Sequence, residues 1–220
     1  MLGRTGSGKT TIARLLLRLY DPDEGKIRIG DVDIRDLKLD ELRDRVAIVT
    51  QNVQMFQASV RDNLALFDPD INESKLMSVI DSLGLTEWID GLSEGLDTVI
   101  TSGGGGLSAG QSQLIAFARV LLIKDPDLVI LDEASSRLDP ATEQLVERSV
   151  SRLLEGRTAF IIAHRLRTVQ RAHEIMIVEQ GRIVEHGDRA RLAADPDSRF
   201  YELLKTGLET LTTDTETVES

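Results

Sequence analysis

The feature that most restricts the fold of this chain lies near its N-terminus, where residues 3–10 read Gly-Arg-Thr-Gly-Ser-Gly-Lys-Thr. This run fits the pattern of Gly, any four residues, Gly-Lys and Ser or Thr that binds phosphate groups. Its glycines allow the backbone to turn tightly enough for successive N–H groups to converge on phosphate oxygens. The loop leads into the N-terminus of a helix, whose positive dipole end favours the same anion. The sequence therefore predicts an α/β domain with a phosphate site at this loop.

The residue types in the loop have separate chemical roles. Lys9 is placed to reach the β- and γ-phosphates of a nucleotide, and the Thr10 hydroxyl can ligate Mg²⁺. A dinucleotide-binding loop does not fit, because Thr11 occupies the third glycine position after Gly6 and Gly8. A glycine-rich segment without a ligand is the simpler alternative.

Short apolar runs alternate with helical patterns along the rest of the chain. Apolar residues at helix spacing predict helices over Thr11–Tyr20 and Gln111–Ile123, and the alternation is typical of a parallel-sheet α/β core. Residues 56–125 show helical signals over Ser59–Ala65 and Glu73–Leu83 but no convincing buried strand, which predicts a mostly helical insertion. The predicted strands are near-continuous apolar runs, which indicates a sheet covered on both faces. They span Val46–Val49, Leu128–Leu131, Ala159–Ala163 and Ile175–Val178.

Two carboxylates, Asp132 and Glu133, directly follow the predicted strand Leu128–Leu131. Ligands of open α/β sheets bind beyond the carboxyl ends of the strands, where the phosphate loop also lies. Asp132 is then suited to hold Mg²⁺, directly or through water, and Glu133 to polarise the water that attacks a γ-phosphate. Taken alone, the pair is equally consistent with a solvated strand end.

The second long helix opens with Leu107–Gln111, which reads Leu-Ser-Ala-Gly-Gln. Ser108 is predicted to cap this helix, and the free N–H groups at its start could bind a phosphate. A capped surface helix without a ligand is the alternative.

Composition narrows the class of protein. The 220 residues carry a net charge of −11, which argues against non-specific binding to nucleic acid. Cysteine is absent, which excludes disulfides and thiolate chemistry, and the longest apolar runs are strand-sized, so no membrane span is expected. We expect an intracellular domain over residues 1–208 and an acidic, disordered tail over residues 209–220.

Read in order, these segments resemble the nucleotide-binding domain of ATP-binding cassette (ABC) transporters, over almost all of the chain from Gly3 to Leu204. The resemblance implies a P-loop NTPase (RecA-like) α/β core with a parallel sheet and an inserted α-helical signalling subdomain at about residues 56–125. The motifs that carry it are Gly3–Thr10 (Walker A), Gln51 (Q-loop), Leu107–Gln111 (signature), Leu128–Glu133 (Walker B), Ser136–Asp139 (D-loop) and His164 (switch histidine).

The same resemblance implies ATP and Mg²⁺ as ligands, and it assigns the site. Glu133, His164 and Gln51 are expected to be catalytic, and Thr10, Gln51 and Asp132 to hold the metal. The residues expected to contact nucleotide are Gly3, Arg4, Thr5, Gly6, Ser7, Gly8, Lys9, Thr10, Thr11, Ser108, Ala109, Gly110, Gln111 and Asp139.

Within the family, the segments Met55–Phe56, Ser59–Leu64 and Gly181–Gly187 resemble those of exporters. The implied assembly is a head-to-tail dimer that holds two ATP, with Ser108 and Gly110 acting on the partner's nucleotide. The other expected partner is the transmembrane domain or subunit of an exporter, at the cytoplasmic face of the plasma membrane. Nucleic acid is not expected as a partner.

Three positions depart from the family pattern: Ala109 replaces the first signature glycine, Ser102 a glutamate and Ser112 an arginine. These differences suggest one member of a heterodimer, although a homodimer remains open.

The N-terminal region departs further, because only Met1 and Leu2 precede the loop, where a buried strand of about five residues is expected. The family's adenine-stacking aromatic residue and its N-terminal antiparallel β subdomain are largely missing from this sequence. We therefore expect weaker nucleotide binding and lower stability than in a chain extended at its N-terminus. The alternative functions are a soluble ABC protein acting on nucleic acid or ribosomes, and an inactive truncated remnant.

Overall fold

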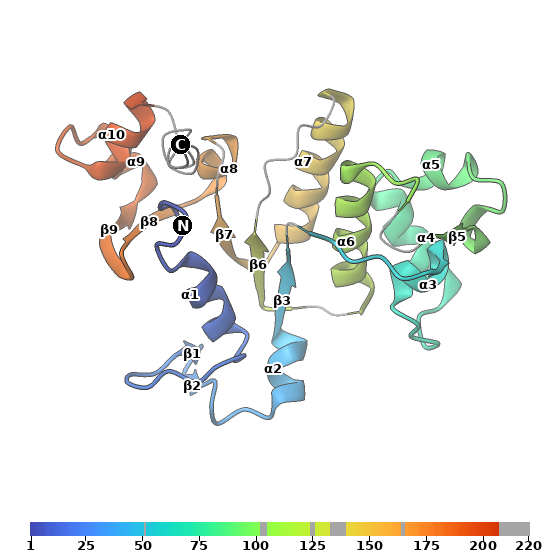
Figure 1. The fold of residues 1–220 in the computed structure, drawn as a ribbon, viewed down its shortest axis with the longest axis horizontal. Helices are drawn as coiled ribbons and strands as arrows, with labels where there is room; N and C mark the ends of the chain where they lie inside the picture. The colour runs from blue at the N-terminus through green and yellow to red at the C-terminus, as the bar shows by residue number, and fades with distance from the viewer. Residues whose placement is uncertain (51, 102–104, 124–125, 133–139, 164–165, 207–220) are drawn as a thin grey trace, which may run out of the picture. The chain divides into compact units, whose positions relative to one another are not determined.

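The structure is a computed structural model, which describes the chain except for residues 51, 102–104, 124–125, 133–139, 164–165 and 207–220 (Figure 1). The chain divides into two compact units. Unit 1 consists of Met1–Val46, Ile130–Ser135 and Phe160–Ser220, and unit 2 of Ala47–Val129 and Ser136–Ala159. The predicted tail at 209–220 lies outside the described residues.

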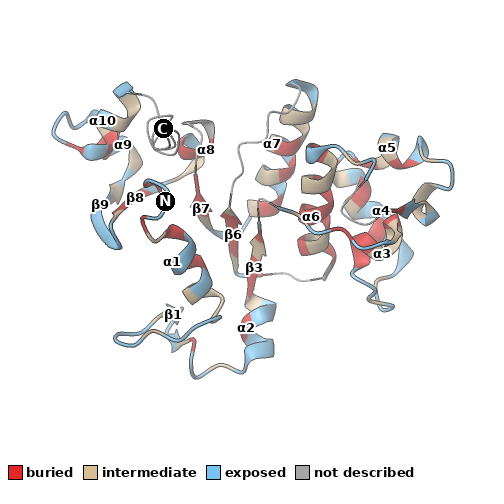
Figure 2. Ribbon diagram, in the orientation of Figure 1, coloured by how far each residue is buried: buried red, intermediate tan, exposed pale blue. Residues whose placement is uncertain are grey.

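Three apolar strands form a sheet in the order β3-β6-β7. They are β3 (Val46–Val49), β6 (Leu128–Asp132) and β7 (Thr158–Ile162), which confirms three of the predicted strands to within one residue at each end. The central strand β6 is buried over residues 129–131 (Figure 2). Because the strands that pair are far apart in the sequence, they need the long crossover connections of a parallel sheet.

The fourth predicted strand is also confirmed, since β8 (Glu174–Glu179) includes residues 175–178. Its regular partner, however, is β9 (Arg182–Asp188), with which it forms an antiparallel hairpin that was not predicted from the sequence. On its other side β8 meets Leu2, which forms an isolated parallel bridge with Ile177. One bridge is too short to make a regular ladder.

The two residues before the phosphate loop act as a short strand of unit 1. The Met1 carbonyl accepts a hydrogen bond from the Ala163 N–H (3.1 Å). The Leu2 N–H donates to the Met176 carbonyl (2.8 Å), and the Leu2 carbonyl accepts from the Val178 N–H (2.9 Å). Backbone pairing on both sides therefore fixes the point at which the loop begins.

Helix α1 spans Lys9–Leu16, whereas the sequence predicted Thr11–Tyr20, so the predicted C-terminus was wrong. The helix ends because Arg18 adopts a left-handed conformation with φ 51°. The Arg18 guanidinium then donates to the backbone carbonyls of Ile34 (3.1 Å) and Leu37 (2.9 Å). These contacts to a distant loop stabilise a conformation that helical periodicity cannot reveal.

The remaining elements of unit 1 are short. In order, they are β1 (Arg28–Ile29) and β2 (Val32–Asp33), which pair antiparallel, α2 (Leu39–Arg45), α8 (Leu166–Arg171), α9 (Arg189–Ala194) and α10 (Arg199–Thr206).

Among the described residues, no helix combines the length and the apolar character that a membrane span requires.

Unit 2 is mostly helical. Its helices α3 (Val60–Ala65), α4 (Glu73–Ser82) and α6 (Ala109–Ile123) confirm predicted helices. A pair of two-residue strands, β4 (Ala58–Ser59) and β5 (Val99–Ile100), was not predicted. The unit also contains α5 (Thr86–Asp90), a 3-10 helix (Gly95–Asp97) and α7 (Pro140–Leu154). The limits of the inserted subdomain at 56 and 125 stay a prediction.

A buried polar network ties α3 to α6 within unit 2. The Asn63 side chain is fully buried; its oxygen accepts from the Phe56 N–H (2.9 Å), and its amide donates to the Phe56 carbonyl (3.0 Å). From α6, Arg119 donates through Nε to the Asn63 carbonyl (2.7 Å) and through Nη1 to the Gln54 carbonyl (2.8 Å). Burial lowers the pKa of Arg119. The network holds the segment before α3 in place.

We expect Asn63→Ala to lower the free energy of unfolding by about 2–3 kcal/mol, because it empties a fully buried site and leaves the partly buried Phe56 N–H without its partner. Urea denaturation of the whole chain measures this loss. Asn52→Ala is the matched control, since Asn52 is exposed, and should change stability by less than about 0.5 kcal/mol. Equal losses in the two variants would show that the network does not stabilise unit 2.

Candidate nucleotide site

The predicted phosphate loop joins the short strand at Leu2 to α1. Two of its glycines, Gly3 and Gly6, are required for different structural reasons. A Cβ on Gly3 (φ 151°) would overlap the Val178 carbonyl oxygen and lie 2.7 Å from Ser7 Oγ. A Cβ on Gly6 (φ 77°) would have no atom within 4 Å. Gly3 is therefore required by a close approach to β8, whereas Gly6 is required by its backbone conformation alone.

The β8–β9 turn holds the other end of the loop. The Gly181 N–H donates to the Ser7 carbonyl (2.9 Å), from a two-residue turn in which Gln180 (φ 46°) and Gly181 (φ 75°) both have positive φ. This geometry is that of a type I′ hairpin. Sequence reasoning missed this contact. The apolar runs on either side of Gln180-Gly181 could have indicated the hairpin, but not that it touches the loop.

Lys9 is the buried cation of the site, with 6% of its surface exposed. Its Nζ donates to the carbonyls of Gly3 (2.6 Å) and Arg4 (2.8 Å), which closes the loop on itself. Burial lowers the pKa of Lys9, and the charge of Asp132 opposes this by raising it. An ammonium group held by carbonyl oxygens can exchange them for phosphate oxygens without leaving the loop.

The start of α1 is free to receive an anion. Its N-cap, Gly8, makes no side-chain capping hydrogen bond, and its first turn contains no acidic residue. The N–H groups at a helix start have no partner within the helix, and they favour negative charge. The loop, Lys9 and this helix end therefore fit the phosphate groups of a nucleotide.

Asp132 is the last residue of β6, half-buried, and belongs to unit 1 together with the loop. In the described residues, no group of three or more His, Asp or Glu side chains could hold a metal ion by itself. Mg²⁺ is commonly bound by one or two protein oxygens together with substrate phosphates and water. The oxygens of Thr10 and Asp132 fit that mode.

The predicted helix cap at Ser108 is confirmed. The Ser108 hydroxyl accepts from the Gln111 N–H (3.1 Å), and the Gln111 side chain accepts from the Ser108 N–H (2.8 Å). This reciprocal pair is a capping box. Ser108 and Ala109 are exposed, Gly110 is buried and Gln111 is half-buried.

The described residues of the predicted site are divided between the two units. Residues 3–11 and Asp132 lie in unit 1, and Ser108–Gln111 in unit 2. A pocket of about 420 Å³ opens beside loop residues 4–7, with Glu179, Gln180 and Arg199 on its other walls. The predicted residues Gln51, Glu133, Asp139 and His164 lie outside the described residues.

We expect Gly3→Ala to destabilise the chain by about 3 kcal/mol, because the methyl group must displace the backbone of β8. Gly6→Ala should cost about 1–2 kcal/mol, because only the left-handed conformation opposes it. Urea unfolding of both variants measures the difference. Equal losses would mean that the approach of Gly3 to Val178 does not constrain the loop.

Comparisons with known proteins agree with this geometry. The family described as "ABC transporter" matches residues 1–136. An ATP-dependent lipid A-core flippase of Chromohalobacter salexigens is 42% identical over 88% of this chain and 33% of its own length. The Toxin RTX-I translocation ATP-binding protein of Actinobacillus pleuropneumoniae is 40% identical over 92% of this chain and 29% of its own.

Among solved structures, a bacterial Atm1-family ABC exporter with ATP bound matches 99% of this chain, with 32% identity and a TM-score of 0.84. The match covers 37% of that exporter chain. The chain thus spans about a third of the length of these relatives.

Proposed function

The chain belongs to the ABC transporter family, and on that premise we propose that it is the ATP-binding and ATP-hydrolysing part of an exporter. The observation that carries the proposal is the phosphate loop, in which the buried Lys9 ammonium is held by loop carbonyls beside the uncapped start of α1. The exporter assignment is supported by the relatives, which include a lipid A-core flippase and a toxin translocation protein.

Binding of ATP would begin with its phosphates. Lys9 would contact the β- and γ-phosphates, and the N–H groups of residues 6–11 would donate to phosphate oxygens. Thr10, Asp132 and Gln51 would hold Mg²⁺, which neutralises charge on the phosphates when bound. The contacts named here would recognise the phosphate chain of the nucleotide, and none of them would recognise its base.

Hydrolysis would be in-line attack of water on the γ-phosphorus. Glu133 would accept a proton from this water as the new P–O bond forms. The bond from the γ-phosphorus to the bridging oxygen breaks, ADP leaves with the electron pair, and the proton passes to the phosphate product. His164 would contact the γ-phosphate and help to hold it in line.

Completion of the site would require a second nucleotide-binding domain, identical or related, in head-to-tail arrangement. Ser108, Ala109, Gly110 and Gln111 of one copy would contact the ATP held by the other, and Asp139 would lie at the same junction. The exposure of Ser108 and Ala109 at the start of α6 supports this role, because the N–H groups of the first helical turn favour an anion.

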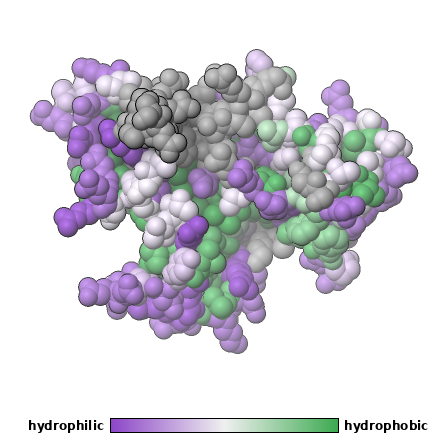
Figure 3. Space-filling view, viewed as in Figure 1, coloured by the Kyte–Doolittle hydropathy of each residue, from purple (hydrophilic) through white to green (hydrophobic). Residues whose placement is uncertain are grey.

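Unit 2 offers a surface for the transmembrane partner. Phe56 and Phe67 are 46% and 55% exposed and form an edge-to-face pair, with ring centroids 5.5 Å apart. Leu66 and Phe67 both have positive φ (50° and 62°), and Leu66 also lines a nearby groove of about 350 Å³. Hydrophobic side chains reach the surface of this unit in Figure 3 as well. We assign the surface to contact with the transmembrane part, at the cytoplasmic face of the plasma membrane.

Glu133→Gln should lower the rate of phosphate release at least about 100-fold while ATP binding is kept, because the amide cannot take the proton. The release of phosphate and the binding of MgATP are measured on the same preparation. Glu94→Gln is the control, since Glu94 is exposed and has no assigned role, and it should keep the wild-type rate.

Two results would contradict this account. A wild-type chain that binds MgATP but releases no phosphate, alone or with its transmembrane partner, would identify an inactive remnant. Unchanged phosphate release by Glu133→Gln would assign the base to another residue.

When membranes are collected from cells that contain the transporter, less of the Phe67→Asn chain than of the wild-type chain should be recovered with them. The affinity of this variant for MgATP should be unchanged. Asn removes the ring but tolerates the left-handed backbone at this position. Met77→Asn, at another exposed apolar residue (42%), is the control and should be recovered like the wild type. Equal recovery of all three would place the membrane contact elsewhere.

A further inference from the structure

The phosphate loop is connected through unit 1 to α10, the helix that ends the described chain. The first link is the β8–β9 hairpin, which contacts Gly3 through the Val178 carbonyl and holds Ser7 through the Gly181 N–H (2.9 Å). Any displacement of this hairpin therefore moves both ends of the loop.

The second link is a carboxylate on β9 that caps α10. Glu185 accepts hydrogen bonds from the backbone N–H groups of Arg199 (3.0 Å) and Phe200 (2.9 Å) and from the Ser198 hydroxyl (3.1 Å). A helix start leaves such N–H groups without partners inside the helix, and a negative charge there is stabilising. The Ser198 hydroxyl shares the cap, because it also accepts from the Phe200 N–H (3.0 Å). Phe200 is 1% exposed, so its side chain anchors the same turn in the core.

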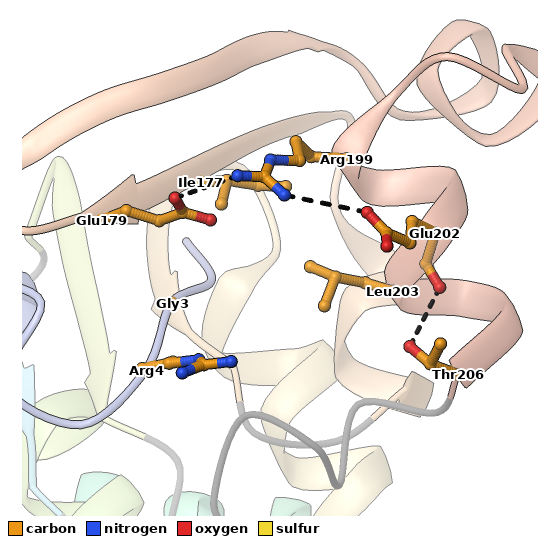
Figure 4. Close-up of a pocket in the computed structure, with 8 residues that line it drawn as sticks. All are labelled: Gly3, Arg4, Ile177, Glu179, Arg199, Glu202, Leu203 and Thr206. Atoms are coloured by element: carbon orange, nitrogen blue, oxygen red, sulfur yellow. Dashed lines mark hydrogen bonds and ion pairs between the residues drawn. The ribbon is translucent and has the colours of Figure 1, made fainter.

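The third link returns from α10 to the hairpin. The Arg199 guanidinium lies between Glu179 of β8 (3.3 Å) and Glu202 of its own helix (3.8 Å), as Figure 4 shows. The pocket in this view, about 240 Å³, has Gly3 and Arg4 of the loop on one side and α10 on the other. Both ion pairs are exposed and individually weak, so the cap is the stronger attachment.

We propose that Glu185 is a positioning residue for nucleotide binding: by capping α10 it holds the β8–β9 hairpin, and through it the phosphate loop, in the binding conformation. The inference rests on the proposed function of the loop. Because linkage between two equilibria is reciprocal, nucleotide in the loop must stabilise the docking of α10 as much as docking favours nucleotide.

The chain contains a matched control for this cap. Asp188, three residues further along β9, caps α9 by accepting from the Arg191 N–H (2.8 Å). Residues 189–194 of α9 line neither of the two pockets beside the loop. Loss of this cap removes a carboxylate from a helix start on the same strand, one hydrogen bond instead of three, at a helix that does not line these pockets.

The first test is calorimetric titration of the whole chain with MgATP. Glu185→Ala should weaken binding about five-fold or more, and Asp188→Ala less than about two-fold, although both lose a helix cap. Glu185→Gln keeps an acceptor oxygen and should restore part of the affinity. Equal changes in MgATP affinity for the two alanine variants would overturn the proposal.

The second test uses the wild-type chain and so does not depend on how the variants fold. Saturating MgATP should slow hydrogen exchange at the amides of α10, starting with Arg199 and Phe200, and leave those of α9 unchanged. A chain that binds MgATP without this protection refutes the linkage alone. A chain that does not bind MgATP refutes the linkage together with the proposed function.

Discussion

The phosphate loop depends on a contact that admits no side chain. Gly3 passes so close to the Val178 carbonyl that a methyl group would overlap it, and backbone hydrogen bonds at Leu2 and Ser7 hold the loop against the same hairpin. The position of Lys9 follows from this contact, since its ammonium group bonds to the carbonyls of Gly3 and Arg4. The loop is thus shaped by β8 and β9 rather than by its own glycines alone.

Local patterns in the sequence predicted the elements but not the contacts between them. The strands at β3, β6 and β7 and the helices α4 and α6 follow from apolar runs and helix spacing, and Asp132 was correctly placed at the end of a strand. The predicted end of α1 was wrong, because Arg18 is stabilised by carbonyls 16 and 19 residues away in the sequence. Interactions over such separations leave no periodic signal.

The same reason explains which contacts were missed, at the site and elsewhere. The contact of Gly181 with Ser7 joins residues that are far apart in the sequence, and so does the bond from Arg119 to Asn63. In each contact the acceptor is a backbone carbonyl. Because every residue has one, the amino-acid sequence does not indicate which carbonyl accepts the hydrogen bond. The cap of α10 by Glu185 is similar, because a glutamate on a strand normally indicates only an exposed face. Motifs identified the phosphate loop, and the structure shows what supports it.

The central claim is that the loop binds a nucleotide through its phosphates, even in a chain with a net charge of −11. A buried lysine, backbone N–H groups and a helix start supply a local positive potential that the net charge does not cancel. The most direct measurement is calorimetric titration with magnesium tripolyphosphate and with adenosine, each followed by MgATP. We predict that tripolyphosphate binds and blocks MgATP, whereas adenosine does not block it. Competition by adenosine without competition by tripolyphosphate would contradict the account.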